Sequence, residues 1–187
     1  MHDGRLHYPC ARGLMEIMSH VSGILEHSYS SLVTLSRNKL LAGFLRLPCE
    51  WAFTLDSDIG FDAQDFACLM ELQSEQDFAA CGVYSRKDAS RKPIVRGLGF
   101  ARIHRSVIEL MYETIAVPFE QDGIPMRDCF ISGATSAGGF IGEDAGFWWM
   151  VAQMGVVPRI EHRCKLVHWG TAAYQVRDKE TEFSFAE

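Results

Sequence analysis

Two carboxylates lie two residues apart, at Asp56 and Asp58, directly after the apolar run from Trp51 to Leu55. A buried strand would deliver both at its carboxyl end, where open α/β sheets bind their ligands. Alternate residues of an extended segment point to the same side, so both carboxylates are expected to address one centre. Mg²⁺ and Mn²⁺ prefer carboxylate oxygens and take further ligands from phosphate and water. The pattern predicts a divalent-cation site, although a turn in which aspartates accept backbone N–H bonds fits the same residues.

A second acidic pair, Glu143 and Asp144, follows Gly142 at the start of an expected helix. Acidic residues in a first turn stabilise a helix by ~0.3–1 kcal/mol without any chemistry. A carboxylate at such a junction, beside a cleft, also serves as a general base for a hydroxyl nucleophile. Both interpretations remain open from the residues alone.

One histidine, His168, follows a short apolar run that ends at Val167. An imidazole at the end of a strand is a candidate third ligand for the same cation. The other histidines of the chain show no ligand spacing.

The elements that must position these groups follow from the apolar periodicity. Helices are expected over residues 12–21, 36–45, 62–70, 106–115 and 143–154, with Ser36, Asp62 and Ser106 as their caps where a cap is visible. Strands are expected over residues 31–35, 51–55, 78–84, 100–103 and 164–167, and a long functional loop over 117–139. Apolar strands that alternate with helices predict an α/β protein: a single-domain three-layer α/β/α sandwich with a mostly parallel central sheet.

The bulk composition limits the class of protein. The chain has 187 residues, a length that suits one domain, and a net charge of −6, which disfavours non-specific binding to nucleic acid. Its six cysteines are scattered without a C-x-x-C pair, which favours buried free thiols in a reducing compartment. Neither a membrane span nor a signal peptide is apparent, so a cytoplasmic location is expected.

Six short motifs occur along the chain in a characteristic order: Ser36 to Asn38, Leu55 to Phe61, Gly82 to Lys87, Gly97 to Phe100, Gly142 to Asp144, and Val167 to Gly170 with Tyr174. Together they resemble glycosyltransferases of the A type (GT-A, nucleotide-diphospho-sugar transferases), more narrowly the small inverting and phage-type enzymes related to family 2. The resemblance implies one domain over residues 1–187, with a nucleotide-binding half (1–58) and an acceptor half (59–187). It also implies transfer of a sugar from a UDP- or GDP-sugar to an acceptor hydroxyl, with inversion.

The resemblance assigns roles to individual residues. Asp58 would coordinate Mn²⁺ or Mg²⁺, Asp56 would contact the metal or the ribose, and His168 would complete the protein's share of the metal shell. Asp144 would deprotonate the acceptor hydroxyl, and Glu143 would orient the acceptor. The remaining donor-site residues that the resemblance implies are Tyr8, Pro9, Arg37, Gly97 and Gly99.

Two other functions fit the same residues. A phosphatase of the haloacid-dehalogenase type would use Asp56 and Asp58 as nucleophile and acid, although that motif normally lies on the first strand. A non-catalytic metal- or sugar-binding module would use them only as ligands, but Gly60 breaks the EF-hand template.

The acceptor is not specified by the sequence. A glycan, a protein, a lipid-linked sugar and a hydroxymethylated nucleobase all remain open. A basic segment keeps DNA among the candidates, although a solvated loop explains it more simply; it comprises Arg86, Lys87, Arg91, Lys92 and Arg96. An oligomer is also possible, since Trp148 and Trp149 suit either a core or a contact surface.

Overall fold

The computed structural model describes residues 6–21, 23, 32–87, 90, 92–136, 138–170 and 173–174. The helices are α1 (Tyr8–Ile17), η1 (Met18–His20), α2 (Val33–Phe44), α3 (Ala63–Met70), α4 (Arg105–Thr114) and α5 (Glu143–Gln153). The strands are β1 (Trp51–Leu55), β2 (Ile59–Gly60), β3 (Ala79–Gly82), β4 (Tyr84–Ser85), β5 (Pro93–Ile94), β6 (Phe100–His104), β7 (Val117–Gln121), β8 (Ile124–Asp128), β9 (Gly133–Ala134), β10 (Phe140–Ile141), β11 (Arg159–Glu161), β12 (Val167–Trp169) and β13 (Ala173–Tyr174).

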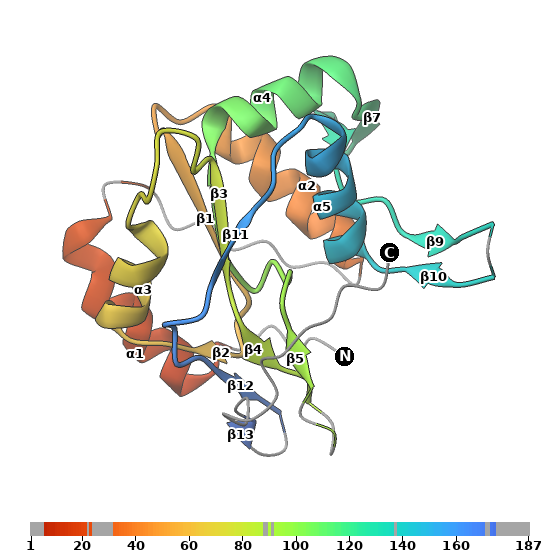
Figure 1. The fold of residues 1–187 in the computed structure, drawn as a ribbon. Helices are drawn as coiled ribbons and strands as arrows, with labels where there is room; N and C mark the ends of the chain where they lie inside the picture. Colours follow the sequence, from red (N-terminus) through yellow and green to blue (C-terminus); the bar gives the residue numbers. More distant parts are fainter. Residues whose placement is uncertain are drawn as a thin grey trace.

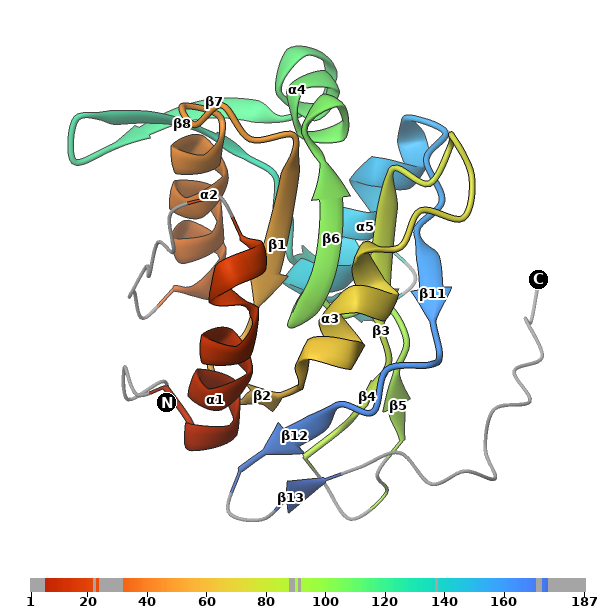
Figure 2. The ribbon, with the colours of Figure 1, turned by 90° about the vertical axis from the view of Figure 1, so that its left-hand side faces the viewer.

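The central sheet has the strand order β1-β6-β3-β11 among the described residues. Strand β6 runs antiparallel to both of its neighbours, and within the described part of this sheet only β3 and β11 pair in parallel. The other pairings form small sheets: β13-β12-β2, β4-β5, β7-β8 and β10-β9. Figures 1 and 2 show the central strands side by side, with the small β2-β12-β13 sheet below them.

Helices pack against the central sheet through two apolar clusters. Ala79, Cys81 and Ile103 belong to the cluster that contains residues of α2, α4 and α5. Ala80 and Phe100 belong to the other cluster, with residues of α1 and α3. Neighbouring strand residues point to opposite faces, so helices cover both sides of the sheet (Figure 2).

This arrangement corrects the predicted fold class. The expected α/β/α sandwich of GT-A type on a mostly parallel sheet is wrong, because the central sheet is mixed and several small antiparallel sheets surround it. Continuous apolar runs led to the error. They indicate that a strand is covered on both faces, and an antiparallel strand such as β6 meets that condition as well as a parallel one.

Several predicted elements also change. The expected strand over residues 31–35 is wrong for its described part, because α2 already begins at Val33 and Ser36 is buried inside it rather than capping it. The expected loop over 117–139 instead holds the β7-β8 hairpin and β9. Helix α4 is capped by His104 rather than Ser106. The capping box of Asp62 and Asp65 at the start of α3 is confirmed.

The structure also bears on the cysteines, on the tryptophan pair and on membrane spans. All six cysteines are free, and every one except Cys49 is buried. Trp148 is buried whereas Trp149 is half-exposed, so the two neighbours divide between the core and the surface. Among the helices that the structure describes, none has the length and apolar content needed to cross a membrane.

A chain of ion pairs, buried at Arg102, Asp77 and Glu161, ties β6, β11 and the segment before β3 together. Arg102 is fully buried and its guanidinium lies 2.8 Å from Asp77, which also accepts from Arg159 at 2.9 Å. Arg159 in turn contacts Glu161, which accepts from Arg163 at 2.7 Å. The network lies beside Trp51, whose ring centroid is 4.5 Å from the Arg102 guanidinium.

This network predicts a loss of stability in acid. Bonds from Arg163 and Arg159 lower the pKa of Glu161 to about 2, although burial opposes the shift. A carboxylate with a depressed pKa stabilises the fold above its unfolded pKa of roughly 4.3, and that contribution disappears as the pH falls toward 2. The unfolding free energies of the wild type and of Glu161→Gln should therefore converge between pH 5 and pH 2 in urea titrations. A difference that is constant over that range would contradict the assignment.

Candidate functional site

The predicted carboxylates lie at the end of the central sheet where β1 finishes and β6 begins. The backbone N–H of Asp56 donates to the carbonyl of Gly99 at 3.0 Å, which joins the two strand ends. The chain then turns, because Ile59 N–H donates back to the carbonyl of Asp56 at 3.1 Å. The segment from Asp56 to Asp58 is thus a turn and not the extended segment that was expected. The two side chains consequently have different partners.

Asp56 belongs to a cluster around Arg37 of α2. The Arg37 guanidinium lies 3.2 Å from Asp56 and 3.6 Å from Glu143, and it donates to Asp144. Asp144 also accepts from the backbone N–H of Leu98 at 3.1 Å. Burial alone would lower the pKa of Arg37, but the charges of Asp56 and Asp144 outweigh it and raise this pKa above its ordinary value. One cation therefore holds three carboxylates from two separate parts of the chain.

Asp58 belongs to a second group, with His168 and Lys87. Its carboxylate is 3.5 Å from Nε2 of His168 and contacts the ammonium of Lys87. Although burial opposes the shift, hydrogen bonds from His168 and Lys87 lower the pKa of Asp58 to about 2. The backbone also fixes Asp58, because its carbonyl accepts from Trp169 N–H at 2.8 Å. The predicted pairing of Asp58 with His168 is therefore present.

Tyr84 and two glycines link the two groups. The hydroxyl of Tyr84 accepts from the backbone N–H of Gly99 at 3.1 Å, and its ring lies edge-on to His168, with 5.2 Å between centroids. A Cβ atom at Gly99 would come within 2.8 Å of both the Asp56 carboxylate and the Tyr84 hydroxyl, and one at Gly97 would overlap the Tyr84 hydroxyl. The glycines are required because these side chains lie directly against the backbone.

The residues around Asp58 suit a divalent cation with two protein ligands. Nδ1 of His168 lies 2.7 Å from the carbonyl of Ser85, which only accepts, so Nδ1 carries a proton. Nε2 then faces the Asp58 carboxylate, and either a second proton or a cation must satisfy that contact. A backbone carbonyl on the far ring nitrogen is the usual support of a metal-binding histidine.

The described residues supply no larger ligand set. No group of three or more His, Cys, Asp or Glu side chains among them is placed to hold a metal ion. Asp56, which was expected to share the ion, pairs with Arg37 instead. An ion at Asp58 and His168 would need phosphate or water oxygens to complete its shell, which is common for Mg²⁺.

The charges of the site favour such an ion. The two clusters contain four carboxylates, on Asp56, Asp58, Glu143 and Asp144, and two basic side chains, Arg37 and Lys87. This negative excess lies at one end of the sheet. A divalent cation would neutralise it and create a surface that accepts phosphate.

Tyr8 and Pro9 lie apart from these clusters. They line a hollow of about 290 Å³ between α1, β2 and β12, together with Trp169 and Gly60, and none of the clustered carboxylates lines it. Tyr8 is 77% exposed. The start of α1 is nevertheless tied to the site, because His7 N–H donates to the carbonyl of Ser57 at 3.0 Å.

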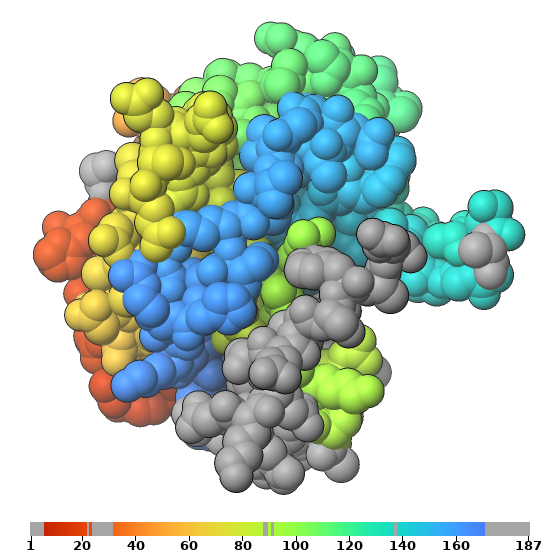
Figure 3. Space-filling view, viewed as in Figure 1, coloured from red at the N-terminus to blue at the C-terminus, as the bar shows by residue number. Residues whose placement is uncertain are grey.

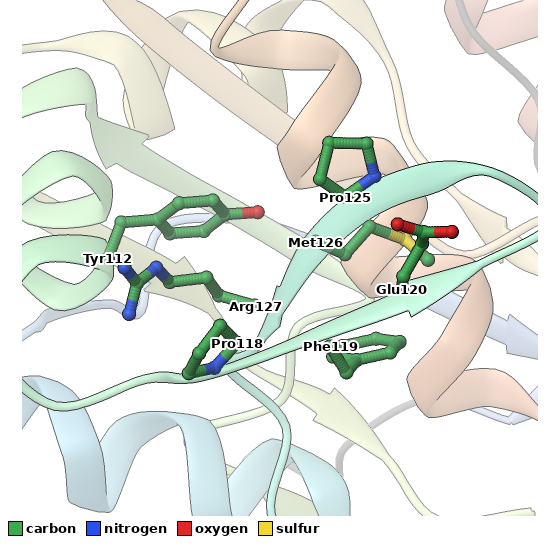
Figure 4. A pocket seen from close by; sticks show the side chains of 7 residues that line it. All are labelled: Tyr112, Pro118, Phe119, Glu120, Pro125, Met126 and Arg127. Atoms are coloured by element: carbon green, nitrogen blue, oxygen red, sulfur yellow. The ribbon is translucent and has the colours of Figure 1, made fainter.

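Two further surface features flank the molecule. A groove of about 560 Å³ lies between Tyr112 of α4 and the β7-β8 hairpin, and Figure 4 shows its lining side chains, none of which belongs to the clusters. The β9-β10 hairpin stands out from the body of the molecule just before α5 (Figures 1 and 3). Its Phe140 is 75% exposed and lies three residues before Glu143.

Sequence reasoning did not assign site roles to Tyr84 and Lys87, which it noted only as parts of a motif and of a basic segment. A signal for them existed. Tyr84 and Lys87 follow β3 closely, as Asp56 follows β1, and the carboxyl ends of β1 and β3 lie at the same end of the sheet.

Comparisons with known proteins address the fold and not the activity. No protein-family model matches the chain, and no curated protein matches it. Among solved structures, the chain is similar to A197 from STIV, with a TM-score of 0.60 and 17% sequence identity over 98% of this chain and 95% of that chain. At this identity the likeness shows a shared fold alone.

Proposed function

We propose that this chain is a metal-dependent glycosyltransferase that moves a sugar from a UDP- or GDP-sugar to an acceptor hydroxyl, with inversion. The observation that carries the proposal is the contact between the Asp58 carboxylate and Nε2 of His168, next to the cluster of Arg37, Asp56 and Asp144. The motifs around these residues resemble those of sugar-nucleotide transferases. Six free thiols suit the cytoplasmic location that we also propose.

Different residues would bind the metal and the diphosphate of the donor. Asp58 and His168 would hold Mn²⁺ or Mg²⁺, which supplies Lewis-acid stabilisation of the departing diphosphate. Arg37 is fixed by carboxylates on two sides and would present a positive charge beside Asp56. Gly97 and Gly99 leave space for Tyr84 and keep Asp56 against the backbone.

Asp144, at the start of α5, is the candidate general base for the acceptor hydroxyl. The acceptor oxygen attacks the anomeric carbon, the bond from that carbon to the diphosphate breaks, and Asp144 takes the hydroxyl proton. Asp144 is held in place by Arg37 and by Leu98 N–H, and a carboxylate oxygen has a second lone pair for this purpose. Glu143 would orient the acceptor, and the exposed ring of Phe140 suits stacking against a sugar, which favours a glycan acceptor.

A screen of nucleotides tests the proposal. UDP, GDP and their sugar derivatives are added to the protein with and without Mn²⁺, and the melting temperature is recorded. One nucleotide class should raise it only with the metal, by the equivalent of about 2.7 kcal/mol at a hundredfold excess over Kd. The effect should be absent in Asp58→Ala and retained in Glu113→Ala, an exposed carboxylate of α4.

Two outcomes would count against a transferase. Hydrolysis of a generic phosphate ester that is lost in Asp56→Asn would indicate a phosphatase. Stabilisation by Ca²⁺ with no response to any nucleotide would indicate a non-catalytic module.

A further inference from the structure

Lys87 forms an ion pair with Asp58, the carboxylate that would bind the proposed cation. Its ammonium contacts one oxygen of Asp58, and His168 faces the other oxygen at 3.5 Å. The Asp58 side chain is only 9% exposed, so few other groups can reach it. Among the described residues, Lys87 and His168 are therefore the two side-chain partners of the Asp58 carboxylate.

The two partners of Asp58 differ in how firmly they are held. His168 is anchored by its bond to the Ser85 carbonyl and by the ring of Tyr84. Lys87 extends from the end of the β4-β5 hairpin, where Arg86 N–H donates to the carbonyl of Lys92 at 2.8 Å. Its side chain is 36% exposed and, like any lysine, has a flexible stem that ends in a point charge. Another cation can therefore displace Lys87 from Asp58 more readily than it can displace His168.

A divalent cation at Asp58 and His168 would lie close to the Lys87 ammonium and repel it. A diphosphate bound to that cation would bring at least two negative charges to the same place. A displaced lysine at this distance would pair with those phosphate oxygens, because charge-assisted hydrogen bonds to phosphate are among the stronger polar contacts.

We propose that Lys87 and the divalent cation compete for the Asp58 carboxylate, and that the displaced Lys87 binds the diphosphate of the donor. Lys87 is then a substrate-binding residue that also neutralises Asp58 when neither the cation nor the donor is bound. The diphosphate half of this inference rests on the proposed function, whereas the competition for Asp58 does not.

Two binding measurements with opposite expected signs test the inference. Isothermal titration of Mn²⁺ without nucleotide should give about tenfold tighter binding in Lys87→Met than in the wild type, because the competing charge is gone. Titration of UDP, GDP and inorganic pyrophosphate at saturating Mn²⁺ should give binding about tenfold weaker in the same variant, because a charged contact to phosphate is lost. Lys87→Arg should bind Mn²⁺ no more tightly than the wild type. The exposed Lys92 of the same hairpin supplies the control, and Lys92→Met should change neither affinity.

A lysine with a purely structural role would give a different result. Lys87→Met would then lower the melting temperature and leave the Mn²⁺ affinity equal to or weaker than that of the wild type, which would overturn the inference. Lys87→Gln serves as the second variant if Lys87→Met does not fold. Failure of both wild type and variant to bind Mn²⁺ would also overturn it. Tighter Mn²⁺ binding in the variant, with no diphosphate bound by the wild type, would sustain the competition and reject the proposed function together with the phosphate role.

Discussion

Replacement of Asp77 by asparagine is expected to lower the free energy of unfolding by about 3–5 kcal/mol, the usual cost of leaving a buried charge without its partner. Asp77 contacts two guanidinium groups, those of Arg102 at 2.8 Å and Arg159 at 2.9 Å. Arg102 is fully buried, so bulk solvent does not reach it to replace the lost charge. Burial already lowers the pKa of Arg102, and Asp77 opposes that shift. Urea denaturation at pH 7 measures the change.

A double variant shows whether the destabilisation comes from the unpaired charge of Arg102 or from a general disruption of packing. In Asp77→Leu with Arg102→Met both charges of the pair are absent, so the destabilisation should be smaller than in Asp77→Asn, because apolar replacement of a buried pair is often neutral. A single variant that loses less than about 1 kcal/mol would show that Arg102 finds another partner. The site lies at the Phe100 end of β6, whereas Asp77 precedes β3, whose first residue pairs with Ile103 near the opposite end, so metal binding should persist in the folded fraction of either variant.

Replacement of Arg37 by methionine is expected to have the largest effect on ligand binding. Three carboxylates, Asp56, Glu143 and Asp144, would lose the cation between them and would repel one another and the diphosphate. We expect UDP or GDP to bind at least about a hundredfold more weakly at saturating Mn²⁺, or roughly 3 kcal/mol. Isothermal titration provides the measurement.

The matched control is Arg37→Lys, which keeps the charge but loses the planar fork that reaches Asp56 and Asp144 together. It should recover part of the affinity and not all of it. Arg37→Met with nucleotide affinity within about threefold of the wild type would remove Arg37 from the donor site.

Local signals predicted the elements near the site better than the sheet that holds them. The Asp62 and Asp65 capping box and the strand before Asp56 could be predicted because short-range hydrogen bonds and apolar runs determine them. The hairpin at Asp122 and Gly123 had a visible signal that was overlooked. Both residues have positive φ, 54° and 74°, and Asp-Gly is a favoured pair for that turn. Strand direction has no comparable local signal, since burial on both faces is common to parallel and antiparallel strands.

The sequence allowed the site residues to be identified, but most of the contacts between them could not be predicted. Asp58 and His168 meet as expected, because β2 and β12 are antiparallel neighbours and His168 pairs with Ile59. Asp56 pairs with Arg37 instead, because the chain turns directly after β1, and the residue pattern allowed a turn as well as an extended segment. The contact of Lys87 with Asp58 depends on the position of the β4-β5 hairpin, and the bond between the Ser85 carbonyl and His168, which are far apart in the sequence, holds that hairpin in place.

A titration with Mn²⁺ tests the central claim most directly, since it asks which carboxylate holds the cation. We expect one Mn²⁺ per chain in the wild type, retention of that binding in Asp56→Asn, and its loss in both Asp58→Asn and His168→Ala. Absence of Mn²⁺ binding in the wild type, or a loss in Asp56→Asn as complete as that in Asp58→Asn, would contradict a metal site built on Asp58 and His168.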